Sequence, residues 1–240
     1  MRRYEDVMEN LAEVDANIDR LKVKYEQARH DDEVKNVLRA AVTSISTLLR
    51  SCLDYMALDV AEHLTQDPNA RAYFPYGVNE AAFRKNMGKG CFRNLDVRKP
   101  SLYEALASVQ PHSCGDEWLI KLCSSNNSAK HDQILKQQRR NSESHTVSLG
   151  GVPFAAGPGT VSVSNSDFGF GLLGKNRPLV MNPSVPLSEM QAAAPGVKID
   201  RMYDWVEFHL EGTATDVMKL MQHSKKEIAL LAERLHLLLP

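Results

Sequence analysis

Apolar residues recur at spacings of three and four over the first quarter of the chain, which is the pattern of amphipathic helices. This spacing predicts one helix over residues 4–29. A second, longer helix is expected to be capped by HDD at 30–32 and to run to about Leu64. DPN at 67–69 then ends the pattern, because proline cannot continue a helix. The apolar positions of the first helix are Val7, Leu11, Val14, Ile18, Leu21 and Tyr25.

The middle of the chain reads as connections between shorter helices. Residues 65–100 are mostly connection, with a short helix expected near 80–87 between two turn signals. A helix over about 101–109 follows, and another begins at Trp118 and fades near Arg140.

From residue 144 to residue 210 the pattern changes to short alternating runs rich in Val, Thr, Gly and Pro, which favour strands separated by turns. An apolar stripe returns over residues 213–238 and predicts a closing helix. This order indicates an α+β fold, a helical bundle with a small antiparallel β-sheet inserted before the C-terminal helix. Because the last helix needs a partner for its stripe, we expect a single domain over residues 1–240. Its expected parts are a helical body of 1–140 plus 213–240 and a β-rich insertion of 144–212.

The composition is that of a soluble globular protein, with 43% hydrophobic and 25% charged residues. A formal net charge of −1 gives no overall attraction to nucleic acid or anionic membranes. It does not exclude a local basic pocket that binds RNA. No run of about 18 apolar residues occurs, and the charged N-terminus lacks an apolar signal core. We therefore expect a cytoplasmic protein that does not enter a membrane. The four cysteines have no C-x-x-C or zinc spacing, which favours reduced, mostly buried thiols.

The second helix carries a polar patch opposite its apolar face. Thr43, Thr47, Arg50 and Asp54 follow the i, i+4, i+7, i+11 spacing that aligns side chains on one side of a helix. Arg50 and Asp54 would form an i,i+4 ion pair. The small hydroxyl residues around them differ from the Lys, Glu and Gln of a fully solvated face. A solvated face, a helix–helix contact and a functional pocket are all open for this patch.

A second polar patch lies in SSNNSAKHDQIL, residues 124–135. Asn127 and His131 are four residues apart, as are Asn126 and Lys130, so each pair would share one helix face. An Asn one turn before a His can fix the tautomer of the ring, and Lys130 would hold the imidazole neutral, as a general base requires. The alternative is that these side chains join two helices through hydrogen bonds or face water.

No pattern of residues predicts a metal or a cofactor. His131 and Asp132 are adjacent and point to different sides of a helix, and the H-x-x-x-H pattern is absent. A nucleophile motif of the G-x-S-x-G type is also absent. The glycines of DFGFGLLGKN at 167–176 do not form a dinucleotide fingerprint, because no helix clearly follows them.

Five segments, taken in order, resemble an uncharacterised bacterial family: LLRSCLDYMALDVA, YFPYGVNEAAF, LASVQPH, WLIKLCSSNNSAKHDQIL and DWVEFHLEGTATDVMKLMQHSKKEI. Members of that family read like LRSALDHLA, FPI, LQPY and NNIDKHR, followed by a strand-rich segment and a terminal helix. The resemblance covers most of the chain from about residue 38 onward. The family's first motif, an Arg followed after four residues by a His, is similar to that of the HEPN helical domains. Many of those domains are metal-independent ribonucleases that pair as dimers.

The resemblance implies an RNA-directed protein that acts as a metal-independent ribonuclease in a defence or toxin system. It also implies that the protein forms a homodimer. Arg50 would stabilise charge developing at the scissile phosphate, His131 would move a proton, and Asn127 would orient that histidine. The same site would be lined by Tyr55, Asp54, Asn126 and Lys130.

The chain departs from the family at three positions. Tyr55 stands where the family has a His, and an unperturbed pKa near 10 makes tyrosine a poor base at neutral pH. Ala129 and Asp132 replace the usual Asp and Arg. His131 would take the role that Tyr55 cannot fill, whereas a strict need for His at position 55 would make this chain an inactive binding protein. The second hypothesis is a non-catalytic protein-interaction module with structural buried polar residues, in which the sheet or the TVSVSNSDFGFGLL loop, residues 160–173, binds a partner protein.

Overall fold

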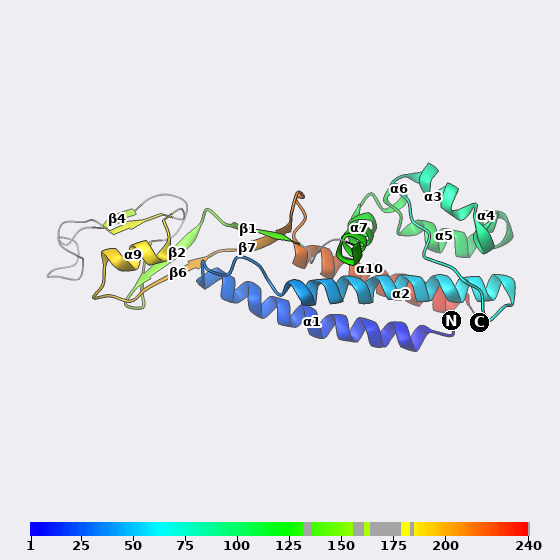
Figure 1. Cartoon of the computed structure of the whole chain (residues 1–240), viewed down its shortest axis with the longest axis horizontal. Helices are drawn as coiled ribbons and strands as arrows, with labels where there is room; N and C mark the ends of the chain where they lie inside the picture. Colours follow the sequence, from blue (N-terminus) through cyan, green and yellow to red (C-terminus); the bar gives the residue numbers. More distant parts are fainter. Residues whose placement is uncertain (132–135, 156–160, 164–178, 183–184, 240) are drawn as a thin grey trace. The chain divides into compact units, whose positions relative to one another are not determined.

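The computed structural model describes residues 1–131, 136–155, 161–163, 179–182 and 185–239. Within these ranges, the side chains of residues 128–131, 154–155, 161–163 and 180 lie outside the description. The chain forms two compact units (Figure 1). The helical unit comprises Met1–Leu21, Leu38–Lys136 and Leu210–Pro240, and the β-rich unit comprises Lys22–Val37 and Gln137–His209.

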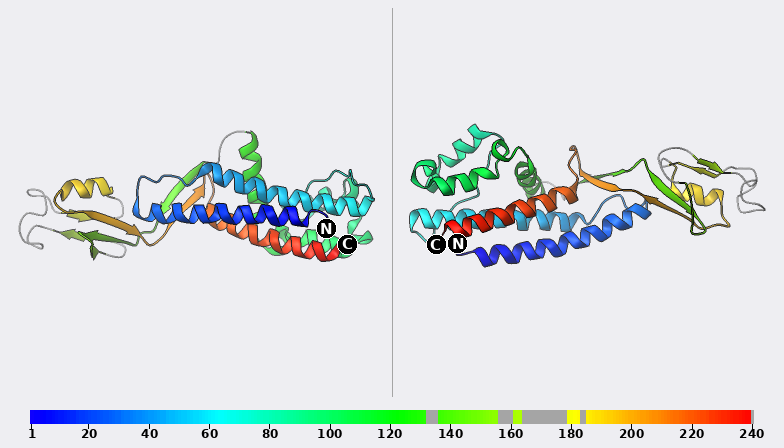
Figure 2. Two further views of the ribbon diagram at one scale, coloured as in Figure 1. Left: turned by 90° about the horizontal axis from the view of Figure 1, so that it is seen from below. Right: turned by 180° about the vertical axis from the view of Figure 1, so that it is seen from behind.

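Three long helices form the body of the helical unit. They are α1 (Tyr4–His30), of which the part up to Leu21 belongs to this unit, α2 (Arg39–Thr65) and α10 (Val217–Leu238). Figure 1 and both views of Figure 2 show them side by side. Burying apolar stripes of this kind against one another supplies most of the stability of a helix in a protein. The stripes that meet include Val7, Leu11 and Val14 of α1, Ile45, Leu49, Cys52 and Met56 of α2, and Leu220, Ile228 and Leu231 of α10.

Shorter helices complete the helical unit. Two of them, α5 (Pro100–Ser108) and α7 (Trp118–His131), pack against α10, and α7 also packs against α2. The others are α3 (Glu80–Met87), η1 (Gly90–Phe92), α4 (Leu95–Arg98) and α6 (Pro111–Cys114). Local sequence sets where helices begin: the side chain of Asn79 accepts the N–H of Ala82 at 2.9 Å and caps α3. Asp216 caps α10 in the same way, accepting the N–H of Lys219 at 2.9 Å.

The β-rich unit contains small sheets. In one of them, β2 (His145–Leu149) lies between β3 (Val152–Ala155) and β6 (Ile199–Tyr203), antiparallel to both. The other pairs are β4 (Val161–Val163) with β5 (Leu179–Met181), which is antiparallel, and β1 (Gln137–Asn141) with β7 (Val206–Leu210). Helix α9 (Leu187–Ala193) packs on β5 and β6. The core that they enclose consists of Val147, Leu149, Leu179, Met181, Met190, Ala194 and Ile199.

The second helix begins later than the sequence predicts, at Arg39 and not after the HDD at 30–32. Asp31 accepts the N–H of Glu33 at 2.8 Å and so caps a turn instead of a helix. Asp32 is bound by two arginines of the β-rich unit, at 3.1 Å from Arg201 Nη1 and 3.7 Å from Arg139 Nη2. These contacts hold the segment after α1 in a non-helical conformation.

The helix expected to fade near Arg140 is described as α7 as far as His131, residues 132–135 lie outside the described residues, and residues 137–141 form strand β1. This segment, QQRRN, has no strand propensity of its own. Its partners impose the extended state, since β1 pairs with β7 and the side chain of Gln137 exchanges two hydrogen bonds with the backbone of Val37 at 2.8 and 3.1 Å.

The α+β fold predicted from the sequence is confirmed, with a helical bundle and small antiparallel sheets that precede the last helix. The expectation that residues 1–240 form one domain stays a prediction.

Among the described helices, none combines enough length with enough apolar character to cross a bilayer. The four cysteines are free, with Cys52 and Cys123 buried, Cys91 half-buried and Cys114 exposed.

Candidate functional site

Arg50 and Asp54 form the i,i+4 ion pair that the sequence predicts on α2. Nε and Nη2 of Arg50 donate to the two carboxylate oxygens of Asp54 at 3.2 and 2.9 Å, so the two groups meet as a fork. Only 13% of the Arg50 side chain and 26% of the Asp54 side chain are exposed. Asp54 Oδ1 also accepts the N–H of Phe74 at 2.9 Å. The pair therefore anchors the segment that follows α2.

The polar faces of α2 and α7 contact each other within the helical unit. Nη1 of Arg50 donates to Cys123 Sγ at 3.0 Å, and Thr47 Oγ1 lies 3.5 Å from Asn126 Oδ1. Burial raises the pKa of the Cys123 thiol, so the thiol remains protonated at neutral pH and its sulfur acts as an acceptor. Of the alternatives for the α2 patch, a helix–helix contact is thus present.

The two predicted patches meet at Thr47 and Asn126, whereas Arg50 contacts Cys123, eight residues before His131. The members of the patches also differ in exposure. Asn126 is 1% exposed, whereas Asn127 faces solvent and Tyr55 is half-buried. Lys130 and His131 continue helix α7, and their side chains lie outside the described residues. Asn127 and His131 do lie one turn apart on a continuous helix. The roles given to these residues stay predictions.

An open pocket of about 390 Å³ reaches Arg50. We call it the Arg50 pocket. It is lined by Arg50, residues 71–76, Asn86 and residues 89–92. Three of the lining side chains are cationic, Arg50, Arg71 and Lys89, and none is acidic. Such a lining favours an anionic ligand.

The aromatic side chains of the Arg50 pocket differ in what they contact. The guanidinium of Arg50 lies over the ring of Tyr76, 5.2 Å from its centroid, in a cation–π contact. Phe74 and Phe92 are buried. Tyr73, by contrast, is 80% exposed. Its ring contributes little to the core and is accessible to a ligand.

Gln110 holds one wall of the Arg50 pocket. It is fully buried, its Oε1 accepts the N–H of Gly77 at 3.2 Å, and its Nε2 donates to the carbonyl of Pro75 at 3.1 Å. A Cβ on Gly77 would lie 2.3 Å from the nitrogen of Phe83, so the close approach needs glycine. These contacts join YFPYG and LASVQPH, which the sequence presents as separate motifs.

Sequence reasoning missed Arg71, Tyr73 and Lys89, because residues 65–100 read as connection. A signal was present in the local charge. Residues 71–99 hold seven basic and two acidic side chains, a net charge of +5 in a chain whose net charge is −1. Aromatic residues among such cations are typical of nucleic-acid binding surfaces.

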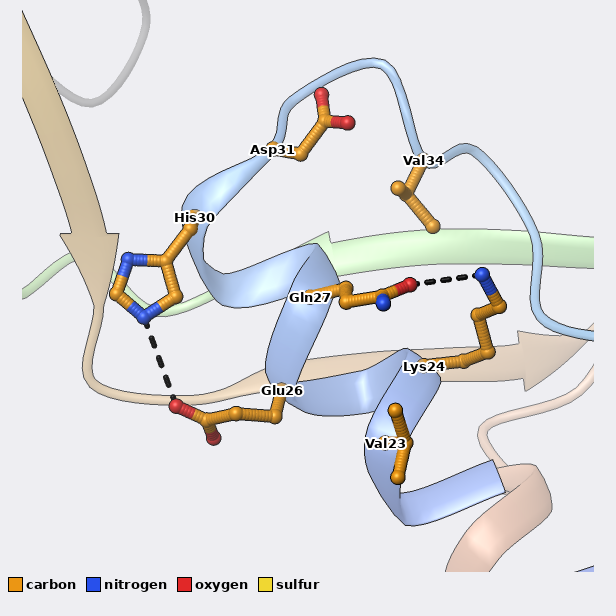
Figure 3. A pocket seen from close by; sticks show the side chains of 7 residues that line it. All are labelled: Val23, Lys24, Glu26, Gln27, His30, Asp31 and Val34. Atoms are coloured by element: carbon orange, nitrogen blue, oxygen red, sulfur yellow. Dashed lines mark hydrogen bonds and ion pairs between the residues drawn. The ribbon is translucent and has the colours of Figure 1, made fainter. Parts of the chain in front are cut away.

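A larger hollow of about 600 Å³ lies in the β-rich unit, along the end of α1 and the turn after it (Figure 3). Its polar side chains contact one another. His30 Nε2 lies 3.5 Å from Glu26 Oε1, and Lys24 Nζ donates to Gln27 Oε1 at 2.7 Å. Since its lining mixes both signs of charge, it is less selective for a charged ligand than the Arg50 pocket.

Within the described residues, no three His, Cys, Asp or Glu side chains lie close enough together to hold a metal ion. The chain matches no protein-family model, no curated protein and no solved structure.

Proposed function

We propose that this chain is a HEPN-like, RNA-directed protein that binds RNA at the Arg50 pocket. The observation that carries the proposal is an open pocket with three cationic and no acidic lining side chains, directly beside the polar contact of α2 with α7. Arg and Lys are the side chains that bind phosphate oxygens, and phosphate contacts dominate the affinity for nucleic acid. The overall charge of −1 does not oppose this, because the cations are concentrated in residues 71–99.

The proposed reaction is metal-independent cleavage of the RNA backbone. A general base takes the proton of a ribose 2′-hydroxyl, whose oxygen then forms a bond to the adjacent phosphorus. The 5′-oxygen of the next nucleotide leaves and accepts a proton, which gives a 2′,3′-cyclic phosphate and a 5′-hydroxyl. His131 is proposed to take and return the proton, Asn127 to orient the ring, and Arg50 to stabilise the charge on the phosphate.

Asp54 is proposed to position Arg50 and not to react. Its fork fixes the plane of the guanidinium. Tyr55 and Lys130 are proposed to line the RNA-bearing face, and the buried Asn126 to support that face through its contact with Thr47. A homodimer would bring two such faces into one assembly.

One observation favours a second candidate function, a non-catalytic protein-interaction module. All three guanidinium nitrogens of Arg50 already have partners, in Asp54 and Cys123, and Asn126 is buried beside Thr47. Polar groups that are paired in this way stabilise and specify a bundle without any ligand. Under this alternative the partner would bind the sheet or the loop of residues 160–173, most of which lies outside the described residues.

Cleavage of a mixed RNA panel in EDTA tests the proposal. The intact protein is expected to cleave, and His131→Ala is expected to lower the rate by about 10²–10⁴-fold, the usual contribution of a general acid–base group. Lys85→Ala, an exposed change on α3 outside the pocket lining, is the control and is expected to keep the full rate. Absence of cleavage by the intact protein, together with a lower thermal midpoint for Arg50→Ala, would favour the interaction module.

A further inference from the structure

We infer that the Arg50 pocket holds one unpaired nucleotide of an RNA strand, with its base stacked on Tyr73 and its flanking phosphates bound by Arg71 and Lys89. This inference rests on the proposed function and names the class of RNA that the site takes, a single strand and not a duplex.

Tyr73 is the side chain that points to a nucleobase. It lines the pocket and is 80% exposed, while Phe74 and Phe92 of the same lining are buried. Tyr76 already has Arg50 against its ring. Every base offers a π-face, so stacking on an exposed aromatic ring tolerates any sequence. Tyr73 therefore suits a base of any identity.

Arg71 and Lys89 supply the uncompensated charge of the Arg50 pocket. The charge of Arg50 is balanced by Asp54 through the fork. Arg71 and Lys89 are exposed, and in the part of the chain that the structure describes neither is paired with a carboxylate. Lys89 Nζ has only the neutral Asn86 Oδ1 at 3.3 Å. Two such cations in one pocket can neutralise two phosphates of a strand.

The shape of the site favours an unpaired base. A volume of 390 Å³ is near the lower end of the range of roughly 300–1,000 Å³ for small-molecule sites. In a duplex both faces of each base are stacked within the helix, so a base reaches a protein ring only when it is splayed out of a single-stranded region. Gln110 and Gly77 fix the backbone of the 75–77 wall, so the pocket is preformed.

Fluorescence anisotropy with the full chain tests the inference. The probe is a short, fluorescein-labelled, 2′-O-methyl single-stranded RNA, which cannot be cleaved because the attacking hydroxyl is blocked. Tyr73→Ala is expected to weaken binding roughly tenfold, and Tyr73→Phe to leave it unchanged, because the ring alone stacks. Arg71→Gln and Lys89→Gln are each expected to reduce the slope of log K against log salt concentration by about 0.7, the value for one phosphate contact of a single strand.

Lys85→Gln is the matched control, since it removes the same charge from an exposed lysine that does not line the pocket. All of these positions are exposed, so unchanged thermal midpoints are expected. A duplex of the same sequence is expected to compete poorly. Binding that none of the pocket variants weakens, or a duplex that competes equally, would overturn the inference and leave an RNA-directed function standing. An intact protein that binds no RNA would overturn both.

Discussion

Two ion pairs of the helical unit share the same i,i+4 spacing but differ in their surroundings. Arg50 and Asp54 are 13% and 26% exposed, whereas Arg84 and Glu80 on α3 are 56% and 54% exposed. Water screens an exposed pair and solvates either partner when the other is removed. A partly buried charge that loses its partner stays desolvated, which costs considerably more.

Asp54→Asn should therefore destabilise the protein far more than Glu80→Gln, although both replace a carboxylate by its amide. We expect a loss of about 1–3 kcal/mol for Asp54→Asn, because Arg50 is left partly buried without a counter-charge. For Glu80→Gln we expect no resolvable change in stability, because water solvates Arg84 when its partner is removed. Urea unfolding followed by circular dichroism measures both. Equal losses would contradict the difference in solvation.

His145 is a buried histidine of the β-rich unit, and we expect its protonation to oppose folding. It is 2% exposed, its Nε2 has no hydrogen-bond partner within the described residues, and its Nδ1 lies 3.4 Å from the carbonyl of Glu143. Burial lowers the pKa of His145 below its ordinary value of 6.5, and the nearby Arg201 acts in the same direction. The folded state therefore favours the neutral imidazole.

The sign of the pH effect follows from this lowered pKa. At a pH below the ordinary histidine pKa, the imidazole is protonated in the unfolded chain but stays neutral in the folded chain. Lowering the pH therefore favours unfolding. Between about pH 7 and pH 5, where an ordinary histidine titrates, the intact protein should lose more stability than His145→Gln. Comparing the two proteins cancels the shared contribution of the carboxylates. Parallel pH profiles in urea unfolding would show that His145 does not titrate this way.

At the scale of elements, the wall of the Arg50 pocket depends on how closely residues 75–77 approach α3. Gly77→Ala would put a Cβ 2.3 Å from the nitrogen of Phe83, so backbone must move and the bond to Gln110 is lost. We expect a cost of about 3 kcal/mol or more. Gly88, beyond the other end of α3, has φ −71° and no atom closer than 3.5 Å to such a Cβ.

Gly88→Ala is thus the matched control and should change stability by less than about 1 kcal/mol, in the stabilising direction. Thermal unfolding of both variants measures the difference. A tolerated Gly77→Ala would show that the wall can relax, and the pocket would then not be preformed.

Elements with a strong period could be predicted from the sequence, because their apolar stripes are a local signal of burial. The closing helix was expected over 213–238 and is found at Val217–Leu238, with Asp216 as its cap. The start of α2 could not be predicted in this way. It is delayed by the contacts of Asp32 with Arg139 and Arg201, which lie more than a hundred residues away in the chain.

The candidate site shows the same division between local and distant information. The Arg50–Asp54 pair follows from helix spacing, because its two residues are one turn apart. The hydrogen bonds of Arg50 with Cys123 and of Gln110 with Gly77 each join segments that are far apart in the chain. No local sequence pattern predicts such contacts. Arg71, Tyr73 and Lys89 lie in connecting segments. These segments have no periodic apolar pattern and were therefore not considered as a site, although their local net charge is strongly positive.

At the scale of the whole molecule, the chain passes between the helical and β-rich units at residues 21–22, 37–38, 136–137 and 209–210. Helix α1 continues through the first of these points and strand β7 through the last. A helix that loses one end loses hydrogen bonds in its next turn as well, since helix formation is cooperative. Sharing of elements therefore couples the unfolding of the two units.

This coupling, and the single domain expected from the sequence, predict one cooperative unfolding transition. The chain has 2 tryptophans, which fall one in each unit: Trp118, 2% exposed, in the helical unit and Trp205, 49% exposed, in the β-rich unit. In Trp205→Phe the fluorescence reports the helical unit alone, whereas calorimetry reports both. We expect coincident midpoints and a calorimetric enthalpy equal to the van't Hoff enthalpy. A second calorimetric peak without a change in Trp118 fluorescence would instead mean that the β-rich unit unfolds as a domain of its own.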